Sequence, residues 1–472
     1  MIGDAIAALD WAILVYFLVV NTFYAVLLTS AGIDQRQQRT TAWRESTWRL
    51  LSSPAAPTLT ILAPAHNEAS TVAQSVRALL TLRYPRLQIV VVNDGSTDTT
   101  LDVLRRELEL EPATTLRDVP LTTAPVRALY RSRRFPQLLV VDKDNGGKAD
   151  ALNAGLNIAS GDLVCAIDVD TLIEPDALLK LARPFLHRDD VIAAGGTVRV
   201  INGSVVRGGR VVAARVPRHP LAGFQTVEYL RAFLFGRVGW NRLGGNLIIS
   251  GAFGLFRREA LLATRGYEHE SVGEDMELVA RLRREALEHG RPHHVESVPD
   301  PVAWTEVPES LRVLGRQRDR WQRGLADVLW RHRRMLFNPR YRAVGMVVVP
   351  YFTLVELLAP VVELLGLAGL IVALLIDAVD IEFAVLFFLV AYGYGLLLNG
   401  FTLLLADFGE RRYLRLRDRA LLVPWAVLDA FAYRPLTVVW RLRGLVRYLR
   451  GRRDWGTMTR RGFTVGEEPP HP

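Results

Sequence analysis

The sequence predicts a doubly wound α/β domain combined with membrane-spanning helices. Two observations predict it. Short β-branched runs alternate with helical stretches between residues 58 and 170, and the other long apolar runs lie near the N-terminus and after Arg342. Strand–helix alternation is typical of a mainly parallel sheet. Half of the 472 residues are hydrophobic, and their uneven distribution favours membrane segments over one large core.

The first apolar stretch is predicted to be a transmembrane helix over residues 8–31. It is long enough to cross the ~30 Å hydrocarbon core of a bilayer. Acidic residues precede it and arginines follow it from Arg36 onward, whereas a signal peptide begins with a basic region. Basic loops stay on the cytoplasmic side, so we expect the N-terminus outside and the next residues in the cytosol.

Residues 50–340 are predicted to form a cytosolic α/β domain with interfacial helices. Its first strands are expected over 59–63, 88–93, 137–142 and 163–168, and its first helices over 69–82, 99–108 and 149–159. Ligands of such sheets bind at the carboxyl ends of the strands. The acidic residues of this domain that attract attention fall at those ends.

Two further stretches, 344–376 and 382–407, are predicted to span the membrane. The connection between them is acidic without basic residues, and arginines follow the second stretch, which places that end in the cytosol. The segment 418–450 is apolar but interrupted by Pro424 and Asp429. We expect an interfacial or re-entrant segment there, followed by a cytosolic tail over 451–472, with a fourth span as the alternative.

Charge and cysteine content exclude several classes of protein. The net charge is +9, but the arginines flank apolar segments and no zinc-finger or basic-zipper pattern occurs. Membrane lipid is therefore the expected anionic partner, and nucleic acid is not expected. The single cysteine, Cys165, lies in an apolar run, which excludes an intramolecular disulfide framework and predicts a buried thiol.

Asp168 and Asp170 stand two apart at a predicted strand end, so both side chains are expected on one side of the chain. Carboxylates in this arrangement can hold a divalent cation that also binds substrate phosphates. The same pattern occurs in ordinary surface turns. Asp94, before a glycine turn, could likewise hold a nucleotide or cap the next helix.

Lys148 follows Gly146-Gly147 at a predicted helix start, where backbone amides and an ammonium suit a phosphate. Asp275, after Glu274, stands at another helix start, as a cap or as a general base. In Gln317-Arg318-Asp319-Arg320-Trp321 the first, fourth and fifth residues share a helix face. Arg320 could bind a diphosphate and Trp321 could stack on a sugar, or the tryptophan could be a core residue.

Together and in this order, these motifs resemble the processive membrane members of glycosyltransferase family 2, the group of cellulose, chitin, hyaluronan and poly-N-acetylglucosamine synthases. The resemblance covers about residues 58–330 by motif and the whole chain by layout. It implies a Rossmann-like glycosyltransferase-A catalytic domain that uses a UDP-sugar with Mg²⁺ or Mn²⁺. It also implies inversion at the anomeric carbon and a growing polysaccharide as acceptor. The enzyme would be a multi-pass protein of a bacterial-type inner membrane with its catalytic domain in the cytosol.

The resemblance also implies a role for each motif residue. These are Asp275 and Glu274 in catalysis, Asp170 and Asp168 at the metal, Glu68, Asp94, Lys148, Asp168 and Arg320 at the donor, and Ser250, Gly251, Gln317 and Trp321 at the acceptor. Trp455, Thr457 and Arg460 resemble the gating loop of hyaluronan and chitin synthases, which closes over the donor. One extra residue separates Thr457 from Arg460 compared with the shortest form of that loop.

Two other functions stay open at this point. The chain could add a single sugar to a lipid carrier, or it could be an inactive partner subunit that binds a nucleotide sugar. The sugar, the linkage and an accessory subunit are also undecided. Glu356 and Glu363, seven apart in a predicted span, indicate either a polar path for a sugar chain or arginine partners that hold helices together.

Overall fold

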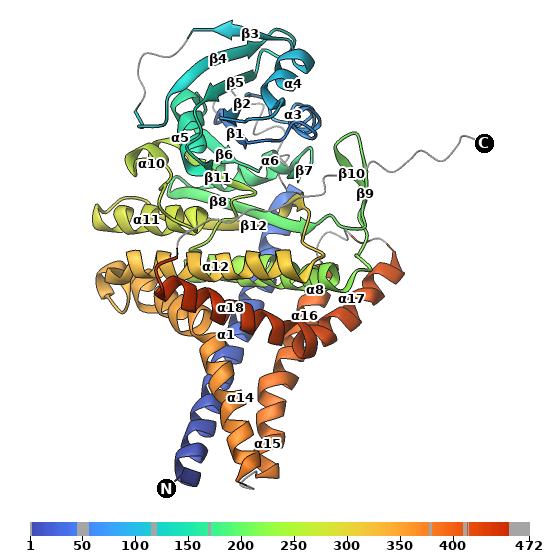
Figure 1. Cartoon of the computed structure of the whole chain (residues 1–472), viewed down its shortest axis with the longest axis vertical. Coiled ribbons are helices and arrows are strands. Elements are labelled where there is room, and N and C mark those ends of the chain that lie inside the picture. The colour runs from blue at the N-terminus through green and yellow to red at the C-terminus, as the bar shows by residue number, and fades with distance from the viewer. Residues whose placement is uncertain are drawn as a thin grey trace, which may run out of the picture. The chain divides into compact units, whose positions relative to one another are not determined.

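The computed structural model describes residues 2–44, 56–114, 120–168, 171–376, 380–408, 413 and 415–452 (Figure 1). The chain divides into two compact units, each composed of segments that are distant in sequence. The sheet unit comprises Gln37–Arg215, Asn246–Val307 and Thr459–Pro472, and the helical unit comprises Met1–Arg36, Val216–Gly245 and Pro308–Met458.

The sheet unit is built on one ten-stranded sheet in the order β3-β4-β5-β2-β1-β6-β11-β8-β12-β7. Its strands are β1 (Leu59–Ala65), β2 (Leu87–Asp94), β3 (Leu110–Ala113), β4 (Val126–Ser132), β5 (Leu138–Lys143), β6 (Leu163–Ala166), β7 (Leu172–Ile173), β8 (Val191–Val200), β11 (Gly254–Arg257) and β12 (His294–Thr305). A separate hairpin consists of β9 (Val205–Arg207) and β10 (Arg210–Ala213).

The four strands predicted from β-branched runs are confirmed as β1, β2, β5 and β6, and they pair in parallel. Beyond them the sheet is mixed, because β8 and β12 pair in parallel whereas β3, β4, β7 and β11 pair antiparallel. Only five residues, 133–137, connect β4 to β5. A parallel crossover needs a dozen or more residues, so this short connection requires an antiparallel pair.

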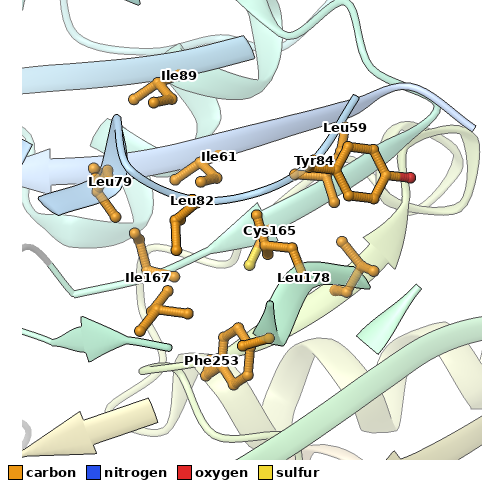
Figure 2. Close-up of a cluster of buried hydrophobic side chains, with 14 of the residues drawn as sticks. Leu59, Ile61, Leu79, Leu82, Tyr84, Ile89, Cys165, Ile167, Leu178 and Phe253 are labelled. Carbon is orange, nitrogen blue, oxygen red and sulfur yellow. The ribbon is translucent and has the colours of Figure 1, made fainter. Parts of the chain in front are cut away.

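Helices cover the sheet and complete two apolar cores. They are α3 (Val72–Leu79), α4 (Thr100–Glu107), α5 (Lys148–Ile158), α6 (Ala177–Leu181), α7 (Arg183–His187), α10 (Arg258–Ala263) and α11 (Glu274–Glu288). Figure 2 shows one core, in which Cys165 lies among Leu59, Ile61, Leu178 and Phe253. The predicted buried thiol is thus confirmed, and burial raises its pKa.

Helix α5 has an unusual position, because ten of its residues, Ala149 to Ile158, are buried. It packs on β1 and β2. Gly155 permits this close contact, since a Cβ atom there would lie 3.0 Å from Leu62 Cδ2. The N-terminus of α5, which carries Lys148, is therefore held firmly at the carboxyl ends of these strands.

The helical unit contains ten α-helices among its described residues, several of them continued by π-helical turns. They are α1 (Ile2–Arg44), α8 (Pro220–Leu230), α9 (Val238–Leu243), α12 (Leu311–Arg331), α13 (Val349–Tyr351), α14 (Ala359–Leu375), α15 (Ile381–Phe388), α16 (Tyr394–Phe408), α17 (Leu416–Leu428) and α18 (Arg434–Leu449). The last residues of α1, from Gln37 onward, belong to the sheet unit.

Three described helical stretches are long and apolar enough to cross a membrane: Ala8–Gln38, Ile381–Ala406 and Leu416–Leu449. Val344–Leu357 and Ala359–Leu375 would add a fourth if taken together, with a bend of 44° between them. Pro360 follows the bend, and proline cannot donate the backbone hydrogen bond that a straight helix needs. These helices indicate a membrane protein, whereas the predicted domain boundaries and the choice between three and four spans stay predictions.

Carboxylates of the apolar helices have polar partners inside the helical unit. Glu363 accepts hydrogen bonds from Arg434 of α18, with Arg434 Nη2 at 2.9 Å. Glu356 accepts from the hydroxyl of Tyr351 at 3.0 Å. Of the two interpretations offered for these carboxylates, arginine pairing is therefore observed for Glu363.

Candidate active site

A pocket in the sheet unit brings together five of the residues predicted for the site. Lys148, Ser250, Gly251, Glu274 and Asp275 all line it. They come from the start of α5, the loop before β11 and the start of α11, segments that span more than 120 positions of the sequence. The pocket is thus formed where two helix N-termini face one loop.

Lys148 is the cationic centre of this pocket. Its Nζ lies 2.8 Å from Asp168 Oδ1 and 3.2 Å from Glu274 Oε1. Burial opposes the charged amine, but the two carboxylates outweigh burial and raise the pKa of Lys148. The lysine therefore carries its positive charge at physiological pH, as a site for a phosphate or diphosphate requires.

The two acidic residues at the start of α11 differ in their surroundings. Glu274 is buried against Lys148, and burial raises its pKa while the ammonium opposes that rise. Asp275 is half-buried and reaches the pocket surface. Its Oδ2 accepts a hydrogen bond from the Gly251 amide at 3.1 Å, and its Oδ1 accepts one from Met276 N at 2.8 Å. Asp275 is thus the better placed of the two to meet a substrate.

Gly251 is close to both functional side chains. A Cβ atom at this position would lie 3.3 Å from Lys148 Nζ and 3.5 Å from Asp275 Cβ. The absence of a side chain keeps the space between the lysine and the aspartate open. This loop therefore shapes the pocket through its backbone, while the preceding Ser250 contributes a hydroxyl that accepts from Ala252 N.

Asp168 follows β6, and Asp170 lies outside the described residues. Within the described part of the chain, no group of three histidine, cysteine or acidic side chains is arranged to hold a metal ion. Carboxylate oxygens are nevertheless the donors that Mg²⁺ and Mn²⁺ prefer. Asp168, at the pocket's lysine, therefore suits such an ion by its chemistry.

Asp94, predicted at the donor, is engaged within the protein. Its carboxylate accepts from Lys143 Nζ at 2.6 Å, from Gly146 N at 3.0 Å and from Gly147 N at 2.8 Å. Lys143 is fully buried and also pairs with Asp150 at 2.5 Å. This buried cluster fixes the glycine turn directly before Lys148.

Glu68, the other predicted donor residue, lies in the loop after β1 and accepts from the Thr71 hydroxyl at 2.7 Å. The same loop is joined to the end of β2, because Asn67 Oδ1 accepts from Thr97 N at 2.8 Å. Glu68 and Asp94 therefore stand at the carboxyl ends of adjacent parallel strands. Neither lines the pocket around Lys148.

The remaining predicted site residues that the structure describes do not line the pocket around Lys148. Gln317, Arg320 and Trp321 lie on α12 of the helical unit. Trp321 is 43% exposed, and Gln317 Oε1 is buried without a hydrogen-bond partner among the described residues. Trp455, Thr457 and Arg460 lie outside the described residues.

Comparison with known families assigns the chain. The family described as glycosyl transferase family 2 matches residues 60–263, and the one described as glycosyl transferase family group 2 matches residues 163–398, half of the chain. The chain belongs to glycosyltransferase family 2. Both matches include the loop of Ser250 and Gly251, and the second also includes Asp275 and α12.

Curated relatives of this glycosyltransferase include two bacterial proteins. It is 28% identical over 276 residues to the poly-beta-1,6-N-acetyl-D-glucosamine synthase of Staphylococcus aureus (strain COL), covering 58% of this chain and 56% of that protein. It is 27% identical over 323 residues to the probable glycosyltransferase YdaM of Bacillus subtilis (strain 168), covering 67% and 64%. The matched part thus spans less than two thirds of the length of each of these relatives.

Solved structures that resemble this glycosyltransferase include the mannosyltransferase PcManGT from Pyrobaculum calidifontis in complex with GDP-Man and Mn²⁺. The TM-score is 0.48 and the identity 21%, over 87% of this chain and 99% of that one. Another is glucosyl-3-phosphoglycerate synthase from Mycobacterium tuberculosis in complex with phosphoglyceric acid. Its TM-score is 0.36 and its identity 20%, over 61% and 84% of the two chains.

The structure of this glycosyltransferase gives a role to three residues for which the sequence predicted none. Lys143 ends an apolar strand, which was the one available signal that a lysine could be buried there. Arg318 lies between Gln317 and Trp321, but the sequence alone predicted no role for it. Glu228, 90 positions before Arg318, gave no sequence signal, yet it is the carboxylate partner of that arginine.

Proposed function

We propose that this family 2 enzyme is a membrane-embedded inverting glycosyltransferase that transfers sugars from a UDP-sugar to a growing β-linked polysaccharide. The observation that carries the proposal is the pocket around Asp275. A half-buried carboxylate lines a pocket whose lysine is kept positive by Asp168 and Glu274. A base and a diphosphate partner are the two groups that sugar transfer requires.

In the proposed reaction, Asp275 takes the proton of an acceptor hydroxyl. The acceptor oxygen forms a bond to the anomeric carbon from the face opposite the diphosphate. The bond from that carbon to the diphosphate oxygen breaks, and UDP leaves with the electron pair. Lys148 neutralises part of the charge that develops on the leaving group. Gly251 keeps Asp275 oriented through its amide.

Asp168, with Asp170, would hold Mg²⁺ or Mn²⁺ beside Lys148. When bound, such an ion neutralises diphosphate charge as a Lewis acid. We expect EDTA to abolish UDP release and excess Mg²⁺ or Mn²⁺ to restore it. Asp168→Asn is expected to raise the metal concentration needed for half-maximal rate, because one anionic ligand is lost. Full activity in EDTA would contradict this part of the proposal, and EDTA saturated beforehand with Mg²⁺ is the control.

We propose roles for the other predicted residues as well. Glu68, Asp94 and Arg320 would serve the donor, and Trp455, Thr457 and Arg460 would close over it. Gln317 and Trp321 would hold the acceptor sugar. The exposed indole supports this role for Trp321, because a sugar offers an apolar ring face.

We also propose an inner-membrane location with the sheet unit in the cytosol, where UDP-sugars are made. The candidate spans and the arginines that flank them support this orientation. Export of the product through the membrane, with or without an accessory subunit, follows from the same proposal.

The function is tested by incubating membranes that contain the enzyme with radiolabelled UDP-sugars. UDP-N-acetylglucosamine is the first donor to try, because the Staphylococcus aureus relative is named a poly-beta-1,6-N-acetyl-D-glucosamine synthase. We expect label in a product that resists organic extraction and grows with time. Label only in a solvent-soluble glycolipid would establish the single-sugar alternative, and no transfer from any UDP-sugar would favour an inactive partner subunit.

A further inference from the structure

The exposed Trp321 of α12 contacts an arginine that belongs to an ion pair. Arg318 is buried, and both terminal nitrogens of its guanidinium donate to Glu228 of α8. Nη1 lies 2.6 Å from Oε1, and Nη2 lies 2.7 Å from Oε2. A planar guanidinium bound through two parallel hydrogen bonds cannot rotate without breaking one of them. Glu228 therefore sets the orientation of Arg318.

Glu228 is itself held from a second side. The hydroxyl of Tyr433 donates to Glu228 Oε2 at 2.9 Å. The Tyr433 ring stacks on Phe224, one turn before Glu228 on α8, with centroids 5.4 Å apart and planes 23° apart. Leu314, one turn before Arg318 on α12, packs in the same apolar cluster. The half-buried carboxylate is thus held in a fixed position beside this apolar cluster.

The guanidinium of Arg318 lies over the indole ring of Trp321 and restricts its orientation. Its Cζ lies 4.4 Å from the centroid of the indole. Residues three apart on a helix are neighbours, and a cation over an indole face is attracted by the ring. Trp321 is nevertheless 43% exposed, so the indole is held in place while much of it is open to a ligand.

We propose that Glu228 is a positioning residue for the acceptor sugar, acting through Arg318 to hold the Trp321 indole in one orientation. The inference rests on the proposed function, in which Trp321 stacks on that sugar. An indole that is already ordered binds a sugar ring without losing side-chain freedom at that moment.

The test measures separate KM values for an oligosaccharide acceptor and for the UDP-sugar donor with purified enzyme. The double variant Glu228→Gln/Arg318→Met removes both charges, because a single change would leave a buried charge unpaired. We expect its acceptor KM to rise about 3- to 10-fold, the range that corresponds to ordering one side chain. The donor KM is expected to change less than about twofold. Arg318→Lys keeps the charge but lacks a planar guanidinium that can stack on the indole, so it is also expected to raise the acceptor KM and not the donor KM.

The matched control is Asp327→Asn/Arg331→Met, which removes another ion pair of α12 that lies two turns beyond the motif. It is expected to leave both KM values unchanged. Trp321→Ala distinguishes the positioning role of Glu228 from the acceptor-binding role of Trp321. If Trp321→Ala raises the acceptor KM and the double variant does not, the inference about Glu228 is overturned while the acceptor role of Trp321 stands. If Trp321→Ala leaves the acceptor KM unchanged, both are overturned.

Discussion

Asp275→Asn is expected to lower kcat for sugar transfer by about 10²–10⁴-fold, the usual contribution of a positioned general base. The amide keeps the shape of the side chain and can still accept from Gly251 N, but it cannot take a proton at neutral pH. The loss should therefore appear in kcat, with little change in the KM for donor. Release of UDP from the purified enzyme measures both quantities.

Glu288→Gln, at the far end of the same helix, is the control for this variant. Glu288 is partly exposed and 4.0 Å from Arg284, so its replacement should change neither the rate nor the thermal stability. A kcat for Asp275→Asn within about threefold of the unchanged enzyme would rule out the base assignment, since general-base catalysis contributes far more than that.

Lys143→Met is expected to destabilise the sheet unit by about 3–5 kcal/mol, which is the usual cost of removing one partner from a buried ion pair. Asp94 and Asp150 would remain buried without their cation. The glycine turn before Lys148 would lose its anchor, so sugar transfer should also fall. Thermal unfolding in detergent, followed by circular dichroism, measures the loss of stability.

Lys180→Met provides a comparison, because Lys180 pairs with the more exposed Asp176 and Asp300. Such pairs contribute less than about 1 kcal/mol. Adding Asp150→Asn to Lys143→Met should recover part of the lost stability, since one uncompensated charge is then removed. Equal melting temperatures for Lys143→Met and Lys180→Met would show that the buried cluster does not stabilise the unit.

The parallel half of the sheet could be predicted from sequence because its strands are continuous apolar runs with helices between them. β3 and β4 escaped prediction because both carry exposed charged residues such as Glu111 and Arg131. β3 is the edge strand, and β4 lies between β3 and β5. β3 contains Pro112, and the two arginines of β4 interrupt its apolar residues. Their pairing follows from the short connection to β5, which is a tertiary constraint.

The pocket residues could also be predicted, because they follow a local sequence pattern. Lys148, Glu274 and Asp275 begin helices that follow glycine, a pattern visible in the sequence, and the structure places them together. The surroundings of Asp94 were not predictable, because its partner Lys143 lies 49 positions away and its burial depends on the whole sheet. Roles assigned through the family resemblance stay predictions until variants are measured.

The ion pair between Glu363 and Arg434 has a consequence for biosynthesis. The two residues lie 71 positions apart, so α14 leaves the ribosome well before its arginine partner exists. At ~5–20 residues per second the interval is roughly 4–14 s. A lone carboxylate is costly in hydrocarbon, so α14 should remain beside the insertion machinery until α18 is made. The carboxyl-terminal helices would then enter the bilayer as one group rather than singly.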